Sequence, residues 1–437
     1  MDASAKKPCE DIARYLYALP VTALFFLILT SAEIALAHGD GSEEFLPAVR
    51  LCIRMEEVTR MACLEQVCVP DKECAEGLVS TVTTLRGPED GMEILKALTE
   101  DARYSIGTTG HDLAHIVGRE TAKHTGTGGE VFLRCPNDFL YGCQHGFFEE
   151  ILKKELSGAK TAEKICESAP GWTQKQIFFC YHGAGHGIVM ANAYDLKRSV
   201  KACAAIKMDL GQHGCSQGLF MELVAAELRG EGKEGIFSKR SLLAPCDIED
   251  RFAWGCAINL APYLLTRTES FEEATELCLS LHKTLRGACI EHFGQLAADP
   301  LWQPRMLEHA GLQGSGLFID QAALLCAGMP KGYERSCQSG AVEHLINYKR
   351  ADDAVAFCNK VDLASQAYCF QTVGFVLGDE AAPPIERERL CASAPEAWEN
   401  LCLTSKSSVK MPWEVPTKNS WADKLRRKIF SFLRNLF

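Results

Sequence analysis

The stretch CAGMPKGYERSC, residues 326–337, holds two cysteines eleven residues apart with a proline and a glycine between them. On a single helix, eleven residues would separate the two Cα atoms by about 16 Å, whereas a disulfide needs about 5.5 Å. A bond between Cys326 and Cys337 therefore requires the chain to reverse direction within the stretch. Residues 271–281 and 353–358 show helical apolar spacing next to other cysteines. The pattern predicts two antiparallel helices joined by a disulfide.

The same cysteine spacing recurs along most of the chain. From Cys143 onward, the second cysteine of each pair returns every 32 to 48 residues, and such a period is typical of solenoids built from helix hairpins. We predict an all-α fold, an α-solenoid of about nine to ten antiparallel helix hairpins over residues 45–405, most of them closed by a disulfide. The predicted pairs are Cys52–Cys63, Cys68–Cys74, Cys135–Cys143, Cys166–Cys180, Cys203–Cys215, Cys246–Cys256, Cys278–Cys289, Cys326–Cys337, Cys358–Cys369 and Cys391–Cys402.

This architecture resembles the tetratricopeptide-like solenoids, especially the cysteine-rich secreted proteins in which a disulfide closes each helix hairpin. The resemblance extends over about residues 51–402. The Trp, Leu-Gly and Tyr signature of the standard tetratricopeptide repeat is absent from the chain. The resemblance therefore implies a fold and leaves the function open.

Two features predict that the chain is exported. Residues 15–32 form a nearly unbroken apolar run between basic residues and the small-residue sequence Ala35-Leu36-Ala37. We interpret residues 1–37 as a signal peptide or, because the run is about long enough to span a membrane, as an N-terminal signal anchor. The chain has 21 cysteines and no CxxC motif, and 20 remain after residue 37, as a full set of disulfides requires. We expect a periplasmic or extracellular location.

The carboxyl-terminal segment differs in composition from the repeats. Residues 406–420 contain two prolines and are predicted to be a linker, and residues 421–437 are predicted to form a basic amphipathic helix. Such a helix binds membrane surfaces, and the alternative is that it caps the last repeat. Together with the N-terminal segment, it makes a membrane surface an expected partner. The formal net charge of −11 argues against nucleic acid.

Histidines gather in the repeats of residues 98–190. Counted from the second cysteine of a repeat, positions +2 and +6 are about one helical turn apart, so their side chains share a face. These positions hold His145 and Glu149 in one repeat, and His182 and His186 in the next. The pattern therefore places possible metal ligands on neighbouring helices.

The preceding repeat lacks its cysteine pair. Counting back 34 residues from Cys143 puts the reference position at Thr109, so that His111 and His115 occupy +2 and +6. Neighbouring helices of a solenoid lie about 8 to 10 Å apart, and side chains from three of them can converge. Imidazole and carboxylate ligands suit zinc, iron, manganese or copper. We predict a site for one or two such ions, with the ligands His111, His115, His145, Glu149, His182 and His186.

Two other roles for these histidines stay open. Each can bond to a carbonyl across a close helix contact, because glycines at +3 allow helices to approach, or the set can act in acid/base chemistry without a metal. His124 and His213 lie off the pattern, and we assign them no special role. Weaker candidates for a supporting or catalytic role are Asp112, Glu120, Tyr141, Glu150 and Tyr181.

The pattern leads to two functional hypotheses. The first is an exported metal-binding repeat protein, with a metal-dependent hydrolase or oxidoreductase activity as its extension. The second is a non-enzymatic, membrane-associated scaffold that binds a protein or peptide on the solenoid face. The fold alone supports the scaffold, and the histidine pattern alone supports the metal site, so the sequence leaves open whether the protein is an enzyme.

Overall fold

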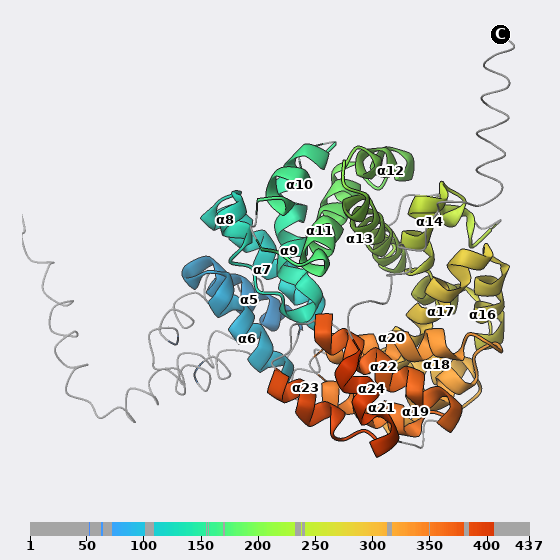
Figure 1. Ribbon diagram of the computed structural model, residues 1–437. Helices are drawn as coiled ribbons and strands as arrows, with labels where there is room; N and C mark the ends of the chain where they lie inside the picture. The colour runs from blue at the N-terminus through green and yellow to red at the C-terminus, as the bar shows by residue number, and fades with distance from the viewer. Residues whose placement is uncertain are drawn as a thin grey trace, which may run out of the picture.

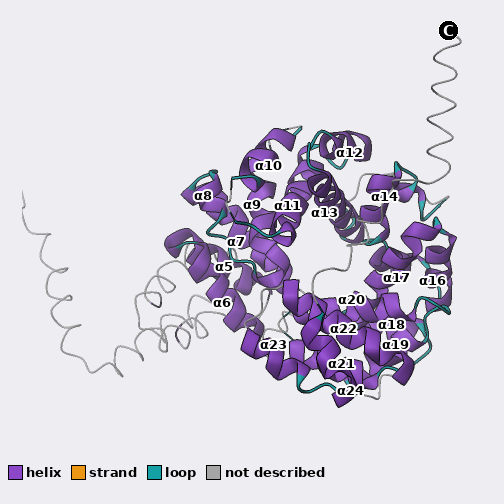
Figure 2. Cartoon of the chain, in the orientation of Figure 1, coloured by secondary structure: helices purple, strands orange, loops and turns teal. Residues whose placement is uncertain are grey.

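The computed structural model describes Cys52, Cys63 and residues 72–405, except for residues 101–108, 154, 156, 169–170, 232–236, 238–240, 313–316, 349 and 380–383. Within these residues the fold is all-α, as predicted, and Figure 2 shows helices and loops without strands. The predicted signal segment and the C-terminal amphipathic helix lie outside the described residues. No helix in the described ranges is long and apolar enough to cross a membrane.

One row of helices forms the inner part of the array, and each member packs on the next. Figure 1 shows this row curving round, so that the last helices return towards the first. The row consists of α7 (Thr109–Thr125), α9 (Asp138–Leu152), α11 (Gln174–Ala191), α13 (Asp209–Leu228), α14 (Asp250–Ala257), α17 (Lys283–Ala297), α20 (Glu334–Asn347), α22 (Leu363–Asp379) and α24 (Glu396–Thr404).

Shorter helices pack against this row and connect its members. Several of them carry the first cysteine of a pair and lie outside the row, as α10, α12 and α16 do in Figure 1. They are α10 (Ala159–Cys166), α12 (Leu196–Ala204), the 3-10 turn η1 (Ala244–Cys246), α16 (Phe271–Ser280), α19 (Phe318–Ala327), α21 (Ala351–Lys360) and α23 (Pro384–Cys391). The other helices are α5 (Lys72–Arg86), α6 (Pro88–Glu100), α8 (Gly129–Phe132), α15 (Ala261–Arg267) and α18 (Gln303–His309).

Nine disulfides in the described part of the chain join neighbouring segments, with Cα atoms 5.3 to 5.7 Å apart. They are nine of the ten predicted pairs. Cys74 is also disulfide-bonded, and its predicted partner Cys68 lies outside the described residues. From Cys166 to Cys402, each pair joins a helix or 3-10 turn to the inner helix that follows it, as the cysteine spacing predicted.

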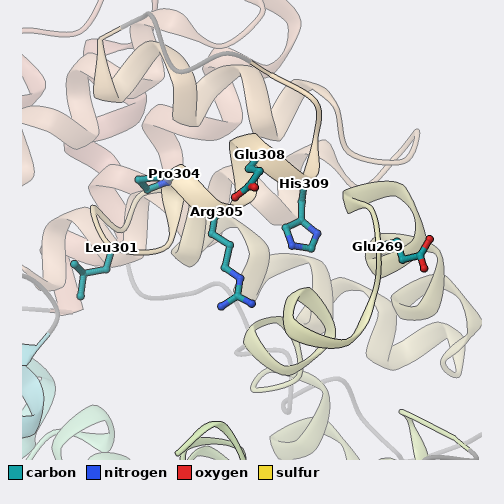
Figure 3. Close-up of a pocket in the computed structure, with 6 residues that line it drawn as sticks. All are labelled: Glu269, Leu301, Pro304, Arg305, Glu308 and His309. Atoms are coloured by element: carbon teal, nitrogen blue, oxygen red, sulfur yellow. The ribbon is translucent and has the colours of Figure 1, made fainter.

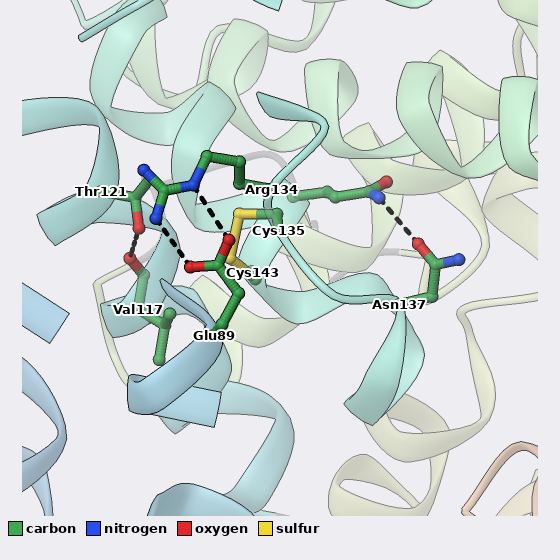
Figure 4. Close-up of a disulfide and its surroundings, with 8 residues drawn as sticks. Glu89, Val117, Thr121, Arg134, Cys135, Asn137 and Cys143 are labelled. Carbon is green, nitrogen blue, oxygen red and sulfur yellow. Dashed lines mark hydrogen bonds and ion pairs between the residues drawn. A yellow bond between two sulfur atoms is a disulfide. The ribbon is translucent and has the colours of Figure 1, made fainter. Parts of the chain in front are cut away.

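The bond between Cys135 and Cys143 ties the turn after α8 to α9 (Figure 4). Beside it, Arg134 binds Glu89 of α6 through two nitrogens, at 2.9 and 2.8 Å. Both groups are largely exposed, so the pair contributes little stability. The disulfide thus holds the turn at the start of α9, and the ion pair extends from the same turn to α6.

Glycines allow the inner helices to approach until backbone meets backbone. A Cβ atom added to Gly218 of α13 would lie 1.9 Å from the carbonyl oxygen of His182, and one added to Gly340 of α20 would lie 1.9 Å from that of Glu291. No side chain fits at such a distance, because real Cβ contacts are at least about 3 Å. The +3 glycines therefore serve close helix packing, as their position suggests.

The same contacts correct the register assigned to the repeat without cysteines. Gly146 at +3 of α9 packs on the carbonyl oxygen of His115, as Gly218 packs on His182 at +2. His115 therefore occupies +2 of α7, and the reference position is Leu113 rather than Thr109. The prediction was one helical turn off because this repeat is shorter than the 34 residues counted. The +6 position of α7 is then Arg119, and His111 lies one turn before His115.

Candidate metal centre

The structure brings the six predicted ligand residues together between α7, α9 and α11. Their side chains are buried, with exposed fractions from 1% for His145 to 7% for His111 and His115. Three groups form in which all ligand atoms lie within 4.8 Å of one another, so each can hold a metal ion. The groups are His111, His115 and His145; His145, His182 and His186; and His115, Glu149 and His186.

The first histidine pair lies on α7. Nδ1 of His111 lies 2.8 Å from the carbonyl oxygen of Phe139, to which it donates a hydrogen bond. Nδ1 of His115 lies 2.5 Å from Oε1 of Glu149 and donates to it. The two Nε2 atoms face each other at 3.0 Å. Both outer nitrogens are thus occupied by oxygen acceptors, while the inner nitrogens converge on one point.

The second pair, on α11, repeats this arrangement. Nδ1 of His182 lies 3.0 Å from Oε1 of Gln217, and the Nε2 atoms of His182 and His186 are 3.1 Å apart. Nδ1 of His186 lies 3.5 Å from Oε2 of Glu222, which belongs to α13. The outer nitrogen of His182 is therefore held by a hydrogen bond, whereas the outer nitrogen of His186 faces a carboxylate at a longer distance.

His145 of α9 lies between the two pairs. Its ring stacks on those of His182 and His186, with centroids 4.7 and 4.9 Å away, and meets those of His111 and His115 edge-on at 5.3 Å. Both of its ring nitrogens are buried and have no hydrogen-bond partner in the part of the chain that the structure describes. A buried nitrogen without a partner costs about 1 to 3 kcal/mol, so two on one side chain require an explanation.

Burial and the neighbouring charges determine the protonation of the cluster. Burial lowers the pKa of His111 to about 3 and the pKa of His145 and His182 far below the ordinary value. Burial disfavours the charge of Glu149, but its neighbours His115 and Arg119 outweigh this effect and lower its pKa. Neutral imidazoles and an ionised carboxylate are the forms that coordinate metals.

His115 is the exception within the cluster. Burial disfavours its charge, but the adjacent Glu149 carboxylate outweighs burial and raises the pKa of His115. A protonated His115 can donate from Nε2 to His111, which would satisfy the α7 pair without a metal. Within the described ranges, no such donor reaches the nitrogens of His145.

Residues that the sequence pattern missed surround the cluster. Nη1 of Arg119 donates to Oε2 of Glu149 at 2.6 Å. On the other side, Arg229 and Tyr194 donate to Oε1 of Glu222 at 2.8 and 3.1 Å. The sequence pattern missed Arg119 because the register of α7 was assigned one helical turn too early. Glu222 follows Cys215 by seven residues, one beyond the positions compared, and no motif marks Tyr194 or Arg229.

Two strained turns contribute to this outer layer. Phe139, Leu140 and Tyr141 have φ angles of 52°, 52° and 61°, and Ala193 and Tyr194 have 50° and 59°. Left-handed backbone is costly for residues with a side chain, at about 1 to 3 kcal/mol, and persists where the surroundings enforce it. The first turn presents the Phe139 carbonyl to His111, and the second directs the Tyr194 hydroxyl to Glu222.

The weaker candidates lie in other surroundings. Glu150 pairs with Lys153 at 2.6 Å, and the hydroxyl of Tyr181 donates to Glu167 at 3.2 Å. Tyr141 stacks on Phe179 with ring centroids 4.4 Å apart. None of these residues belongs to the three ligand groups, and the same holds for Asp112, which is exposed, and for Glu120, which pairs with Lys123 and His124.

A polar pocket of about 620 Å³ lies in another part of the array, around α18 (Figure 3). It contains no residue of the histidine cluster, so the cluster and this opening are separate features. The pocket is lined by Glu269, Leu301, Pro304, Arg305, Glu308 and His309.

Fold and site together define a class: a disulfide-linked, all-α repeat protein with a buried cluster of five histidines and a glutamate. Comparison with family models, curated proteins and solved structures finds no match to this chain. The function must therefore be argued from the geometry of the cluster.

Proposed function

We propose that this protein is an exported metal-binding repeat protein whose centre between α7, α9 and α11 holds a transition metal. The observation that carries the proposal is His145. Its two buried nitrogens have no partner among the described residues, and they lie among four further imidazoles. A bound cation would satisfy a nitrogen that no residue in the described part of the chain reaches.

The outer contacts of the other histidines support the same proposal. Metal-binding histidines characteristically donate their second ring nitrogen to a carboxylate or carbonyl, which orients the ring. His111, His115 and His182 each place Nδ1 against such an oxygen. The Nε2 separations of 3.0 and 3.1 Å are close to those of two ligands of one ion, since bonds of about 2.1 Å give about 3.0 Å at a right angle and about 3.4 Å at a tetrahedral angle.

The donor set restricts the metal without identifying it. Imidazole nitrogens with a carboxylate suit zinc, iron, manganese and copper. Thiolate ligands do not contribute, because the cysteines of the described inner helices are in disulfides. The disulfides also support loading outside the cytosol, since they persist in oxidising compartments.

Burial favours one kind of chemistry over another. The histidines are exposed by 7% or less, so a peptide or polymer cannot reach the ligand atoms. We therefore favour electron transfer or a reaction with a molecule of a few atoms over hydrolysis of a large substrate. Such an oxidoreductase role needs a redox-active ion, which iron, manganese or copper would supply and zinc would not, and an external molecule that donates or accepts the electron.

The test is metal analysis of the full chain purified with its disulfides intact. Elemental analysis should find at least one equivalent of a transition metal, and His145→Ala should remove it. The matched control is His213→Ala, because His213 lies on α13 and outside the three ligand groups. Wild-type protein without stoichiometric metal, after growth with each of the four metals, would show the proposal to be wrong.

A further inference from the structure

The centre contains the same arrangement of side chains twice. Each half has two histidines one turn apart on one helix, a carboxylate on a neighbouring helix at the outer nitrogen of the second histidine, and an arginine bound to that carboxylate. The first half consists of His111, His115, Glu149 and Arg119, and the second of His182, His186, Glu222 and Arg229.

Glu222 takes the place in the second half that Glu149 takes in the first. Its side chain is buried at 6% exposure, although no metal pattern in the sequence includes it. Oε1 accepts from Arg229 and Tyr194, which leaves Oε2 directed at His186. Two groups, Arg229 and Tyr194, thus hold a carboxylate beside the outer nitrogen of His186, a position that orients metal ligands.

The hydrogen bonding of the second half is incomplete. If neutral His186 donates from Nε2 to His182, its bare Nδ1 faces the Glu222 carboxylate. If it donates from Nδ1, its bare Nε2 faces the bare Nε2 of His182, whose own proton goes to Gln217. Either neutral form leaves two acceptors facing each other, and Nδ1 of His186 has no hydrogen-bond partner among the described residues. A cation between the Nε2 atoms removes this conflict.

We propose that the centre binds two metal ions, one in each half, with His145 available to both and Glu222 as the positioning residue of the second site. This inference rests on the proposed metal-binding function. The first site binds more tightly, because Glu149 already lies 2.5 Å from His115, whereas Glu222 lies 3.5 Å from His186 and must move closer. Binding therefore occurs in two steps of unequal affinity.

The experiment titrates metal-free, disulfide-intact protein with Co²⁺, followed by its visible spectrum, and with Zn²⁺ by calorimetry. The wild type should bind two equivalents in separate steps. Glu222→Gln should weaken the second step by about 10- to 100-fold and leave the first unchanged, as loss of an orienting carboxylate does. Glu149→Gln should weaken the first step instead. Tyr194→Phe, which removes only a hydroxyl, should weaken the second step less.

Glu227→Gln is the matched control, because Glu227 lies on the same helix and pairs with Arg267 instead. It should leave both steps as in the wild type. Binding of a single equivalent, or an unchanged second step in both Glu222→Gln and Tyr194→Phe, would overturn the two-ion inference while leaving the metal-binding function in place. A wild type that binds neither ion would overturn the function itself. Thermal unfolding of the metal-free variants separates lost binding from lost folding.

Discussion

The pairs α11–α13 and α17–α20 share one backbone arrangement and differ in the chemistry it carries. In the first pair Gly218 packs on the carbonyl of His182, and in the second Gly340 packs on that of Glu291, with the same 1.9 Å approach. His182 and Glu291 are thus equivalent +2 residues. The repeat provides the position, and the side chain placed there decides whether the position can hold a metal.

The charges around the histidine cluster and those around Glu291 differ accordingly. In the histidine cluster, the Glu149 carboxylate meets His115 and Arg119, and its pKa falls. At the second position, burial and the neighbouring Glu343 raise the pKa of Glu291 to about 8. A carboxylate matched by cations stays ionised and can serve a metal, whereas one opposed by a second carboxylate takes up a proton.

The largest expected effect is common to both regions. Each disulfide closes a loop of 8 to 14 residues, and such a bond contributes about 3 kcal/mol in the chain-entropy model. Reduction of all of them should therefore unfold the whole array, which far-UV circular dichroism with and without a thiol reductant would show. Peptide mapping without reductant should recover the local pairs. Survival of the helical signal in either region would mean that packing there suffices without the bonds.

The second effect tests the shared backbone arrangement. Gly218→Ala and Gly340→Ala each place a methyl group against a carbonyl oxygen and should lower the free energy of unfolding by about 1 to 3 kcal/mol, as overpacking does. Chemical denaturation measures both. Gly77→Ala is the control, because nothing lies within 4 Å of the added atom in α5, and it should raise stability by up to about 1 kcal/mol. A marked difference between Gly218→Ala and Gly340→Ala would break the equivalence of the two pairs.

The limits of sequence reasoning follow from the same residues. Cysteine spacing predicted the hairpins because a short disulfide loop forces the chain to reverse. The spacing of His145 with Glu149 and of His182 with His186 predicted a shared face because one helical turn separates them. Without a cysteine to mark its register, α7 was placed one turn away. The contacts of Glu222 with Tyr194 and Arg229 depend on a left-handed turn and a helix end, which no periodic pattern reports.

The third effect is a pH dependence that arises from the pair Glu291 and Glu343. The pKa of Glu291 in the folded protein is about 8, above its value in the unfolded chain, so its contribution to stability is present at low pH and lost as pH rises towards 8. Glu291→Gln should remove this loss and raise stability at pH 8 relative to pH 5 by up to about 3 kcal/mol. Denaturation at the two pH values measures the difference. Equal gains at both would show that Glu291 is ionised throughout.

The smallest effect is expected at the histidine cluster, where a substitution should raise the stability of the metal-free protein. In metal-free protein, His145→Leu removes two buried nitrogens that have no partner and replaces the ring with an apolar side chain of similar size. The relief of about 1 to 3 kcal/mol exceeds the usual cost of a change in shape, so stability should rise by about 1 kcal/mol. His182→Leu is the control at the same +2 position. It should lower stability, because Gln217 loses its partner.

With saturating Zn²⁺, the wild type should become more stable than His145→Leu. A ligand that binds only the folded state stabilises it by about 4 kcal/mol at a thousand times its dissociation constant. Wild-type protein would gain this stabilisation, and His145→Leu would gain much less of it. If leucine at position 145 gives a more stable metal-free protein than histidine does, the histidine serves a role other than stability. If His145→Leu instead destabilises the metal-free protein as strongly as His182→Leu, the ring of His145 contributes to folding by packing alone, and the main support for the metal centre is lost.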